Sequence, residues 1–193
     1  MGIISRFPAG ATKPYIEEIY NSDGQLIDVK MYGYKTIRDS AFSYCPSLAL
    51  TTLPSGITNI GYSAFSGCSS LSLTALPSGI TNISDYAFES CSSLALTTLP
   101  SGITNIGQGA FSGCSSLALT TLPSGITNID YRAFEGCSSL ASLTFEGTPE
   151  YIDGTIFIGC NNLTTINVPW AEGAVANAPW GATNATINYG HTG

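Results

Sequence analysis

The chain has 193 residues, of which 44% are hydrophobic and only 10% are charged, and its formal net charge is −7. Five of its six basic residues precede Asp39, so the longer acidic remainder has no cationic face for a nucleic acid, and this class of partner is excluded. The length suits a single domain with a sizeable core. No apolar run of about 18 residues occurs, which excludes membrane insertion by a spanning helix, and the N-terminal apolar stretch is too short for a signal peptide.

The first 32 residues are predicted to form two segments. Residues 1–14 fit no regular pattern and are expected to be a tail, whose Arg6, Phe7 and Lys13 are candidate docking residues for a larger assembly. Residues 15–32 alternate apolar and polar around an Asn-Ser-Asp-Gly sequence, which predicts a β-hairpin that caps the N-terminal end of the fold.

Residues 33–169 contain an internal repeat. Phenylalanine recurs every 23 residues from Phe42 to Phe157, a cysteine follows each phenylalanine after three residues, and a leucine follows each cysteine after three more. A fixed period in the range of 20–29 residues, with clustered leucines, is typical of leucine-rich repeats. One such coil cannot bury its apolar face alone, but stacked coils, here called rungs, bury a continuous face.

The order of residues within one repeat predicts how each rung is built. A parallel strand is expected around Leu117–Leu122, followed by a Pro-Ser-Gly corner that ends the strand. Ile126 and Ile129 then point inward, and a helical or turn-like segment is expected around Ala133 and Phe134. The prediction is therefore an α/β-type repeat solenoid, a right-handed coil of about six rungs with a parallel strand ladder on one face.

Residues 170–193 are predicted to be a C-terminal cap. Trp170 and Trp180 are expected to cover the open end of the core, and a final strand is expected over Ala185–Tyr189.

The pattern Ala-Phe-x-x-Cys-x-x-Leu, followed by Leu-Pro-x-x-Ile-x-x-Ile, resembles the BspA-like leucine-rich-repeat family over residues 33–169. The sequence from Val168-Pro169 to Trp180 is also similar to the closing segment of members of this family, and residues 169–186 are similar to the ends of repeat proteins encoded by gut bacteria and their phages. The resemblance implies a bacterial protein that adheres to host proteins or other cells, located outside the cell, on its surface or on a virion. Adhesins of this family usually carry a signal peptide and an anchor, and this sequence shows neither.

The spacing of the cysteines and carboxylates bears on whether the chain could bind a metal or catalyse a reaction. One cysteine per rung favours a column of small, buried, reduced side chains, with disulfides between adjacent rungs or a metal site as alternatives. The only histidine, His191, lies too near the C-terminus to build a catalytic pair in the core, and the carboxylates belong to different rungs. We therefore expect no enzyme and no cofactor, and interpret an acidic strip beside the phenylalanines as a solvated surface.

Two sets of positions vary between otherwise copied rungs: the three residues before each Ala-Phe and the two before each cysteine. The candidate interaction residues in the first set are Tyr62, Tyr86, Tyr131 and Arg132, because aromatic and arginine side chains are the types most suited to an interface. Drift at unconstrained, exposed positions is the alternative explanation of this variation.

The leucine-bearing segment offers a second candidate surface. In one strand register, Leu50, Leu73, Leu96 and Leu119 form an exposed apolar ladder that would bind a partner or a second copy of the chain. In the other register these leucines are core and the neighbouring threonines face water. The core assignment is favoured, because four stacked exposed leucines would promote aggregation.

Two functions are consistent with these features. The first is a non-enzymatic recognition or adhesion module that binds a protein or a glycan. The second is a structural accessory subunit of a phage particle, docked through its N-terminal tail. Either could involve assembly into a larger particle or a homo-oligomer.

Overall fold

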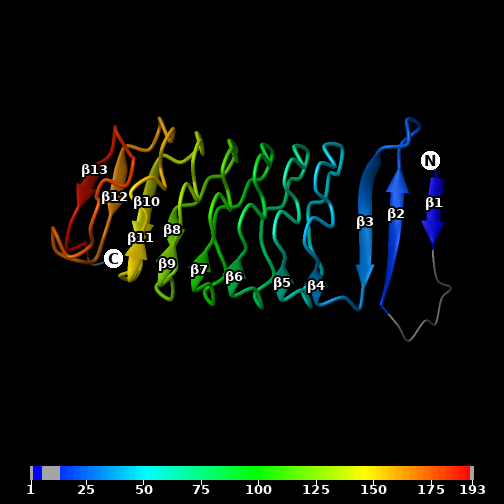
Figure 1. The fold of residues 1–193 in the computed structure, drawn as a ribbon, viewed down its shortest axis with the longest axis horizontal. Coiled ribbons are helices and arrows are strands. Elements are labelled where there is room, and N and C mark those ends of the chain that lie inside the picture. Colours follow the sequence, from blue (N-terminus) through cyan, green and yellow to red (C-terminus); the bar gives the residue numbers. More distant parts are fainter. Residues whose placement is uncertain (1, 6–13, 192–193) are drawn as a thin grey trace.

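The computed structural model describes residues 2–5 and 14–191, which form an elongated parallel β-solenoid of about seven stacked rungs (Figure 1). This part of the chain contains strands and turns but no helix, so the predicted α/β label is wrong. Around each phenylalanine the backbone makes successive short turns, as in the bond from Cys68 N–H to Phe65 O at 3.0 Å. Left-handed residues such as Ser63 (φ 49°) and Gly67 (φ 75°) interrupt these turns, and a right-handed helix cannot continue through them.

One long side of the solenoid, here the asparagine side, carries a short strand in each of the first six rungs. These strands are β4 (Thr36–Ile37), β5 (Asn59–Ile60), β6 (Asn82–Ile83), β7 (Asn105–Ile106), β9 (Asn128–Ile129) and β11 (Tyr151–Ile152). They pair in parallel as β4-β5 and as β11-β9-β7-β6, each strand in register with the residues 23 positions away. Side-chain bonds reinforce the ladder, since Asn105 Nδ2 donates to Asn82 Oδ1 and Asn128 Nδ2 to Asn105 Oδ1, both at 2.7 Å.

Within the rungs, the opposite, leucine side carries strands only toward the C-terminus. They are β8 (Thr121–Leu122), β10 (Ser142–Phe145), β12 (Thr165–Asn167) and β13 (Thr186–Asn188), in the parallel order β13-β12-β10-β8. The predicted strand around Leu117–Leu122 is therefore present only at its end, and the earlier rungs have no strand there.

The spacing of buried residues explains this difference. Leu117, Leu119 and Leu122 are all buried, but a strand alternates its side chains and cannot point residues three apart to one face. Leu143 and Phe145 are both buried and two residues apart, so a regular strand satisfies them.

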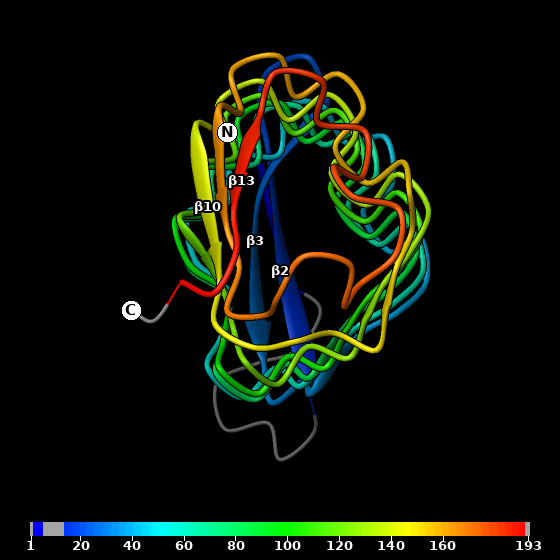
Figure 2. The same cartoon turned by 90° about the vertical axis from the view of Figure 1, so that its left-hand side faces the viewer.

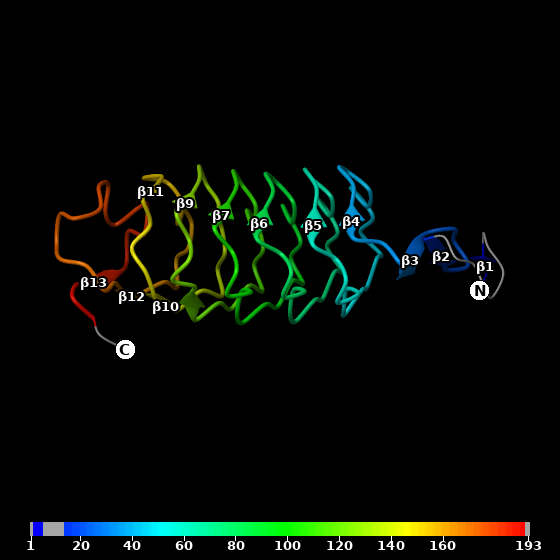
Figure 3. The same cartoon turned by 90° about the horizontal axis from the view of Figure 1, so that it is seen from below.

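The N-terminal end is a three-stranded antiparallel sheet, β1 (Gly2–Ser5), β2 (Tyr15–Tyr20) and β3 (Leu26–Tyr32), in the order β1-β2-β3. β3 continues the leucine side, because Ala49 N–H donates to Ile27 O at 2.9 Å just as Ser72 N–H donates to Leu50 O at 3.0 Å one rung later. The sheet then projects beyond the first rung (Figures 1 and 3).

The core runs the length of the solenoid inside the oval formed by the rungs (Figure 2). From Phe42 to Phe157, consecutive phenylalanine rings stack with centroids 5.4–5.7 Å apart. The cysteines from Cys68 to Cys160 are buried and free, and each thiol donates to a phenylalanine carbonyl, as Cys114 Sγ does to Phe88 O at 3.0 Å. Their predicted burial is confirmed, while Cys45 at the first rung is partly exposed.

The C-terminal end contains a seventh rung that the phenylalanine count does not reveal. Trp180 lies 23 residues after Phe157, is fully buried, and accepts a bond from Phe157 N–H through its carbonyl at 2.9 Å. Trp170 is also buried, and its ring packs against Phe145 at 5.3 Å and Trp180 at 6.2 Å. Tryptophan thus takes the phenylalanine position where no further rung follows in the described chain.

Candidate functional site

The candidate site lies where each rung turns just before its phenylalanine. The residue two positions before the phenylalanine is left-handed in five consecutive rungs: Ser40, Ser63, Tyr86, Gly109 and Arg132, with φ between 49° and 57°. This conformation costs a non-glycine residue roughly 1 kcal/mol or more. From the second to the fifth rung the following alanine and phenylalanine are buried, and the residue before the bend is partly or fully exposed.

We call the group Tyr62, Tyr86, Gln108, Tyr131 and Arg132 the tyrosine edge. A cleft of about 150 Å³ lies on it, between rungs three and five. It is lined by Tyr86, Glu89, Gln108, Gly109, Ser112, Tyr131, Arg132 and Glu135. Three of the four tyrosine-edge residues predicted from the sequence, Tyr86, Tyr131 and Arg132, therefore lie around one cleft, and Tyr62 packs beside them.

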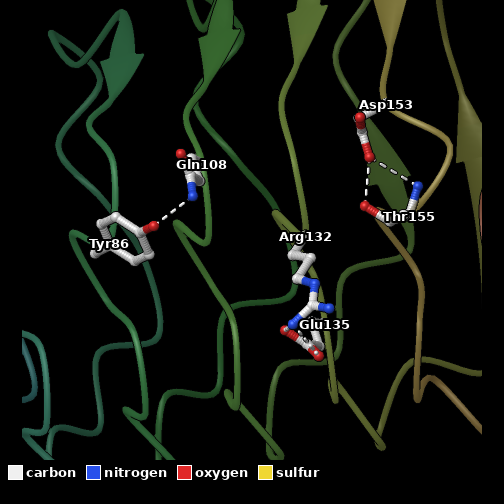
Figure 4. Close-up of polar contacts among 6 residues, drawn as sticks. All are labelled: Tyr86, Gln108, Arg132, Glu135, Asp153 and Thr155. Carbon is white, nitrogen blue, oxygen red and sulfur yellow. Dashed lines mark hydrogen bonds and ion pairs between the residues drawn. The ribbon is translucent and has the colours of Figure 1, made fainter.

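Tyr86 forms one wall of the cleft. Its hydroxyl accepts a short hydrogen bond from Gln108 Nε2 on the next rung (Figure 4), and its ring meets Tyr62 edge-on with centroids 5.8 Å apart. Gly109 makes room for the ring, because a Cβ at that position would lie 2.8 Å from Tyr86 Cδ1 and Cε1. Burial raises the pKa of the Tyr86 hydroxyl, and Tyr62 and Glu89 add to this effect, so the group stays neutral.

Arg132 and Glu135 form the opposite wall. Their side chains make an ion pair with Arg132 Nη1 3.3 Å from Glu135 Oε1 (Figure 4), and the guanidinium carbon lies 4.9 Å from the centroid of the Tyr131 ring. Arg132 Nε is buried and has no hydrogen-bond partner in the described part of the chain. The arginine is held by two neighbours and still has donors available for a third group.

The same turn in the sixth rung is built differently. Asp153 accepts from Thr155 N–H at 2.8 Å and also from the Thr155 hydroxyl (Figure 4), and Tyr151 OH donates to its second oxygen at 3.2 Å. This carboxylate serves its own turn, and no residue of the sixth rung lines the cleft.

The leucine ladder is not a surface. Leu50, Leu73, Leu96 and Leu119 are at most 4% exposed, so their role as interaction residues is wrong and the favoured core assignment is confirmed. The threonines that follow them, such as Thr97 and Thr120, are exposed instead. The candidate docking residues Arg6, Phe7 and Lys13 lie outside the described residues.

Gln108 and Gly109 were recognised as variable but not singled out as site residues. The signal was present, because Gly109 stands in a column where Tyr86 and Arg132 have large side chains. Tyr44, the most exposed tyrosine at 79%, was also missed, and its ring lies over Gly67 as that of Tyr86 lies over Gly109.

The arrangement is suited to binding. Two aromatic rings, a guanidinium group, an amide and carboxylates can hydrogen-bond and stack, but the cleft has no histidine or cysteine to act as a base or nucleophile. In residues 2–5 and 14–191, no group of three or more potential metal ligands comes together, and no helix is long and apolar enough to cross a membrane.

A solenoid of leucine-rich rungs whose residues vary along one exposed edge is typical of leucine-rich repeat proteins. Residues 33–170 match the BspA-type leucine-rich repeat region in six copies, and the chain belongs to this family. Its members are often displayed on surfaces, and leucine-rich repeats generally mediate protein binding and are generally not enzymes.

Solved structures agree with this assignment. The T. pallidum leucine-rich repeat protein TpLRR is 30% identical, with a TM-score of 0.61 over 78% of this chain and 80% of that one. A leucine-rich repeat protein from Bacteroides ovatus is 25% identical, with a TM-score of 0.64 over 86% of this chain but only 45% of that protein. None of the curated proteins compared with the chain matches it.

Proposed function

We propose that this protein is a non-enzymatic recognition module, displayed on a cell or virion surface, that binds a protein or a glycan through the tyrosine edge. The observation that carries the proposal is the cleft in which Tyr86 of the third rung meets Tyr131 and Arg132 of the fifth. Tyrosine and arginine dominate the energetics of protein interfaces because they combine a large apolar area with hydrogen bonds.

The chemistry around the cleft suits both classes of ligand. An aromatic ring can stack on a sugar or an apolar side chain, while Gln108 and Arg132 can donate hydrogen bonds to hydroxyl or carbonyl oxygens. Tyr62 and Tyr131 are 50% and 39% exposed, so part of their area is free to be buried by a ligand.

A binding screen tests the proposal. The purified protein is applied to printed glycans and to immobilised host surface proteins, and each hit is measured again with the Tyr86→Ala/Tyr131→Ala variant. Loss of hot-spot residues should weaken binding roughly tenfold or more. Tyr44→Ala is the matched control, since Tyr44 is an exposed tyrosine outside the cleft and its loss should leave affinity unchanged. Equal affinity of all three proteins for every hit would exclude the tyrosine edge.

A second candidate is the accessory subunit of a phage particle, docked through residues 1–14. The three-stranded sheet that projects beyond the first rung favours it, because β1 lies at the far end of the molecule from the seventh rung (Figure 3). Deleting residues 1–14 should abolish co-purification with the particle and leave the tyrosine edge intact. Unchanged co-purification would exclude this mode of docking.

In both functions we assign the caps a structural role. β3 supplies a strand before the first rung, and Trp170 with Trp180 covers the core after the sixth, so both caps reduce the apolar area left open at the ends of the column.

A further inference from the structure

The second surface of interest is the C-terminal end of the asparagine side. β11 is the last strand of its sheet and pairs only with β9, so its other edge is open within the described part of the chain. On the leucine side, by contrast, the seventh rung supplies β13, which pairs with β12. The solenoid thus ends one strand earlier on the asparagine side than on the leucine side.

A groove of about 360 Å³ lies along this open edge. One wall consists of Pro149, Glu150, Tyr151 and Ile152, and the other of residues 174–177 in the seventh rung. The walls converge at Gly154, where an added Cβ would lie 3.3 Å from Asn177 Cβ. The volume is at the lower end of the range for ligand sites.

The backbone of β11 presents acceptors to this groove. In the preceding rungs Thr104 O and Ile106 O accept from Asn128 N–H and Asp130 N–H, at 3.3 and 2.9 Å. Thr127 O and Ile129 O accept in the same way from Tyr151 N–H and Asp153 N–H, both at 3.0 Å. The equivalent carbonyls of the sixth rung are those of Glu150 and Ile152, and no backbone N–H of the described chain donates to either.

The groove is also acidic. Glu150 lines it and is exposed, Asp153 directly follows one lining segment, and Glu172 lies two residues before the other. No lysine or arginine follows Arg132 in the sequence. A positively charged occupant is therefore complementary to this end of the molecule.

We propose that an extended, basic segment of a partner polypeptide adds a strand to β11 in this groove. The segment lies parallel to β11, and two of its N–H groups, two residues apart, donate to Glu150 O and Ile152 O. One side chain lies beside the exposed Tyr151 ring, and lysine or arginine side chains pair with the surrounding carboxylates. The site is separate from the tyrosine edge, so it does not depend on the function proposed above.

Synthetic peptides test this proposal. A labelled hexapeptide of alternating lysine and valine is titrated into the full chain, with binding followed by fluorescence anisotropy and by the backbone amide resonances of residues 149–153. We expect saturable binding that shifts these resonances. A peptide N-methylated at alternate residues on the bonding edge loses two hydrogen bonds and should bind roughly tenfold or more weakly. A glutamate–valine peptide should not bind.

Variants of the chain locate the site. Glu150→Lys should weaken binding about two- to fivefold, as expected for an exposed charge pair. Ala176→Trp should abolish binding by filling the groove from an exposed position. Asp23→Lys makes the same charge change at the opposite end of the molecule, in the turn between β2 and β3, and should have no effect.

Three results would overturn the proposal: no binding of the lysine–valine peptide at about 1 mM, equal binding of the N-methylated peptide, or an equal response of Glu150→Lys and Asp23→Lys. A fourth would replace the occupant. If the chain dimerises in sedimentation equilibrium and Ala176→Trp makes it monomeric, the groove holds a second copy and not a basic peptide.

Discussion

The phenylalanine column and the tyrosine edge lie within a few residues of each other on every rung, yet they follow opposite rules. The rings from Phe65 to Phe134 are identical, buried and stacked at 5.5–5.6 Å, whereas the tyrosine-edge positions change on every rung. A close-packed column leaves no space for variation, because any change in volume must be absorbed by the rungs above and below. The exposed bend has no such constraint, so a ligand site can be built there without disturbing the core.

The largest effect is expected for Phe111→Ala, in the middle of the phenylalanine column. It removes a fully buried ring that stacks on both neighbours and should lower the free energy of unfolding by about 3–5 kcal/mol. Urea unfolding followed by circular dichroism measures the change. Gln108→Ala, three residues away on the same rung, should change it by less than about 1 kcal/mol. Similar losses for both variants would contradict the division between column and edge.

The buried thiols give a second test, in alkaline solution. Burial raises the pKa of Cys68 to about 12 and of Cys160 to about 11, from an ordinary value of 9.0. The unfolded chain therefore loses these protons first, and the stabilisation is complete below about pH 9 and lost as the pH rises toward the folded-state pKa. The slope should reach about 1.4 kcal/mol per pH unit for each thiol.

Unfolding experiments between about pH 8 and about pH 11 measure this slope. Cys68→Ala should reduce the slope by the contribution of one thiol. Cys45→Ala should reduce the slope least, because Cys45 is partly exposed. A free energy of unfolding that does not fall over this range would show that the cysteine column is accessible to solvent.

A third test asks whether Gly109 shapes the edge. Gly109→Ala places a Cβ against the Tyr86 ring and puts alanine at φ +56°, and it should cost about 1–2 kcal/mol. Gly136→Ala is the matched control, because that glycine is also left-handed (φ +69°) but the nearest atom to its added Cβ is 3.9 Å away. Only Gly109→Ala should be partly rescued by Tyr86→Ala, and a rescue of both variants would point to a general effect of Tyr86.

The smallest effect is expected for Arg132→Ala. The ion pair with Glu135 is exposed to solvent, and such pairs contribute at most about 1 kcal/mol. Thermal unfolding should therefore change little, while affinity for a tyrosine-edge ligand falls. A large loss of stability would assign Arg132 to the fold and remove it from the binding site.

Much of the fold could be predicted because a 23-residue period determines which residues stack on one another in three dimensions. Residues one period apart must stack, so the repeated phenylalanine, cysteine and leucine positions predict continuous buried columns. The α/β label failed because the short segment after each Ala-Phe is compatible with a helical turn. The left-handed residues that prevent a helix include Ser63, Tyr86 and Arg132, which no simple pattern distinguishes from right-handed ones.

The candidate site was only partly predictable. Variation between rungs identified Tyr62, Tyr86, Tyr131 and Arg132, since positions that differ among copies are not dictated by the core. That three of them share one cleft depends on where each side chain points after its bend, and on the space that Gly109 leaves on the intervening rung.

The sequence by itself therefore determined the family, the period and the buried columns, because these follow from which residues repeat. Only the tertiary structure decided the direction in which Leu50 and its equivalents point, and the open edge of β11. These features depend on the register between rungs and on the fact that, in the described chain, the first and last rungs have a neighbouring rung on one side only. The repeated residues determine the buried interior of the solenoid. The two ends and the exposed bends depend instead on contacts made by residues that are not repeated.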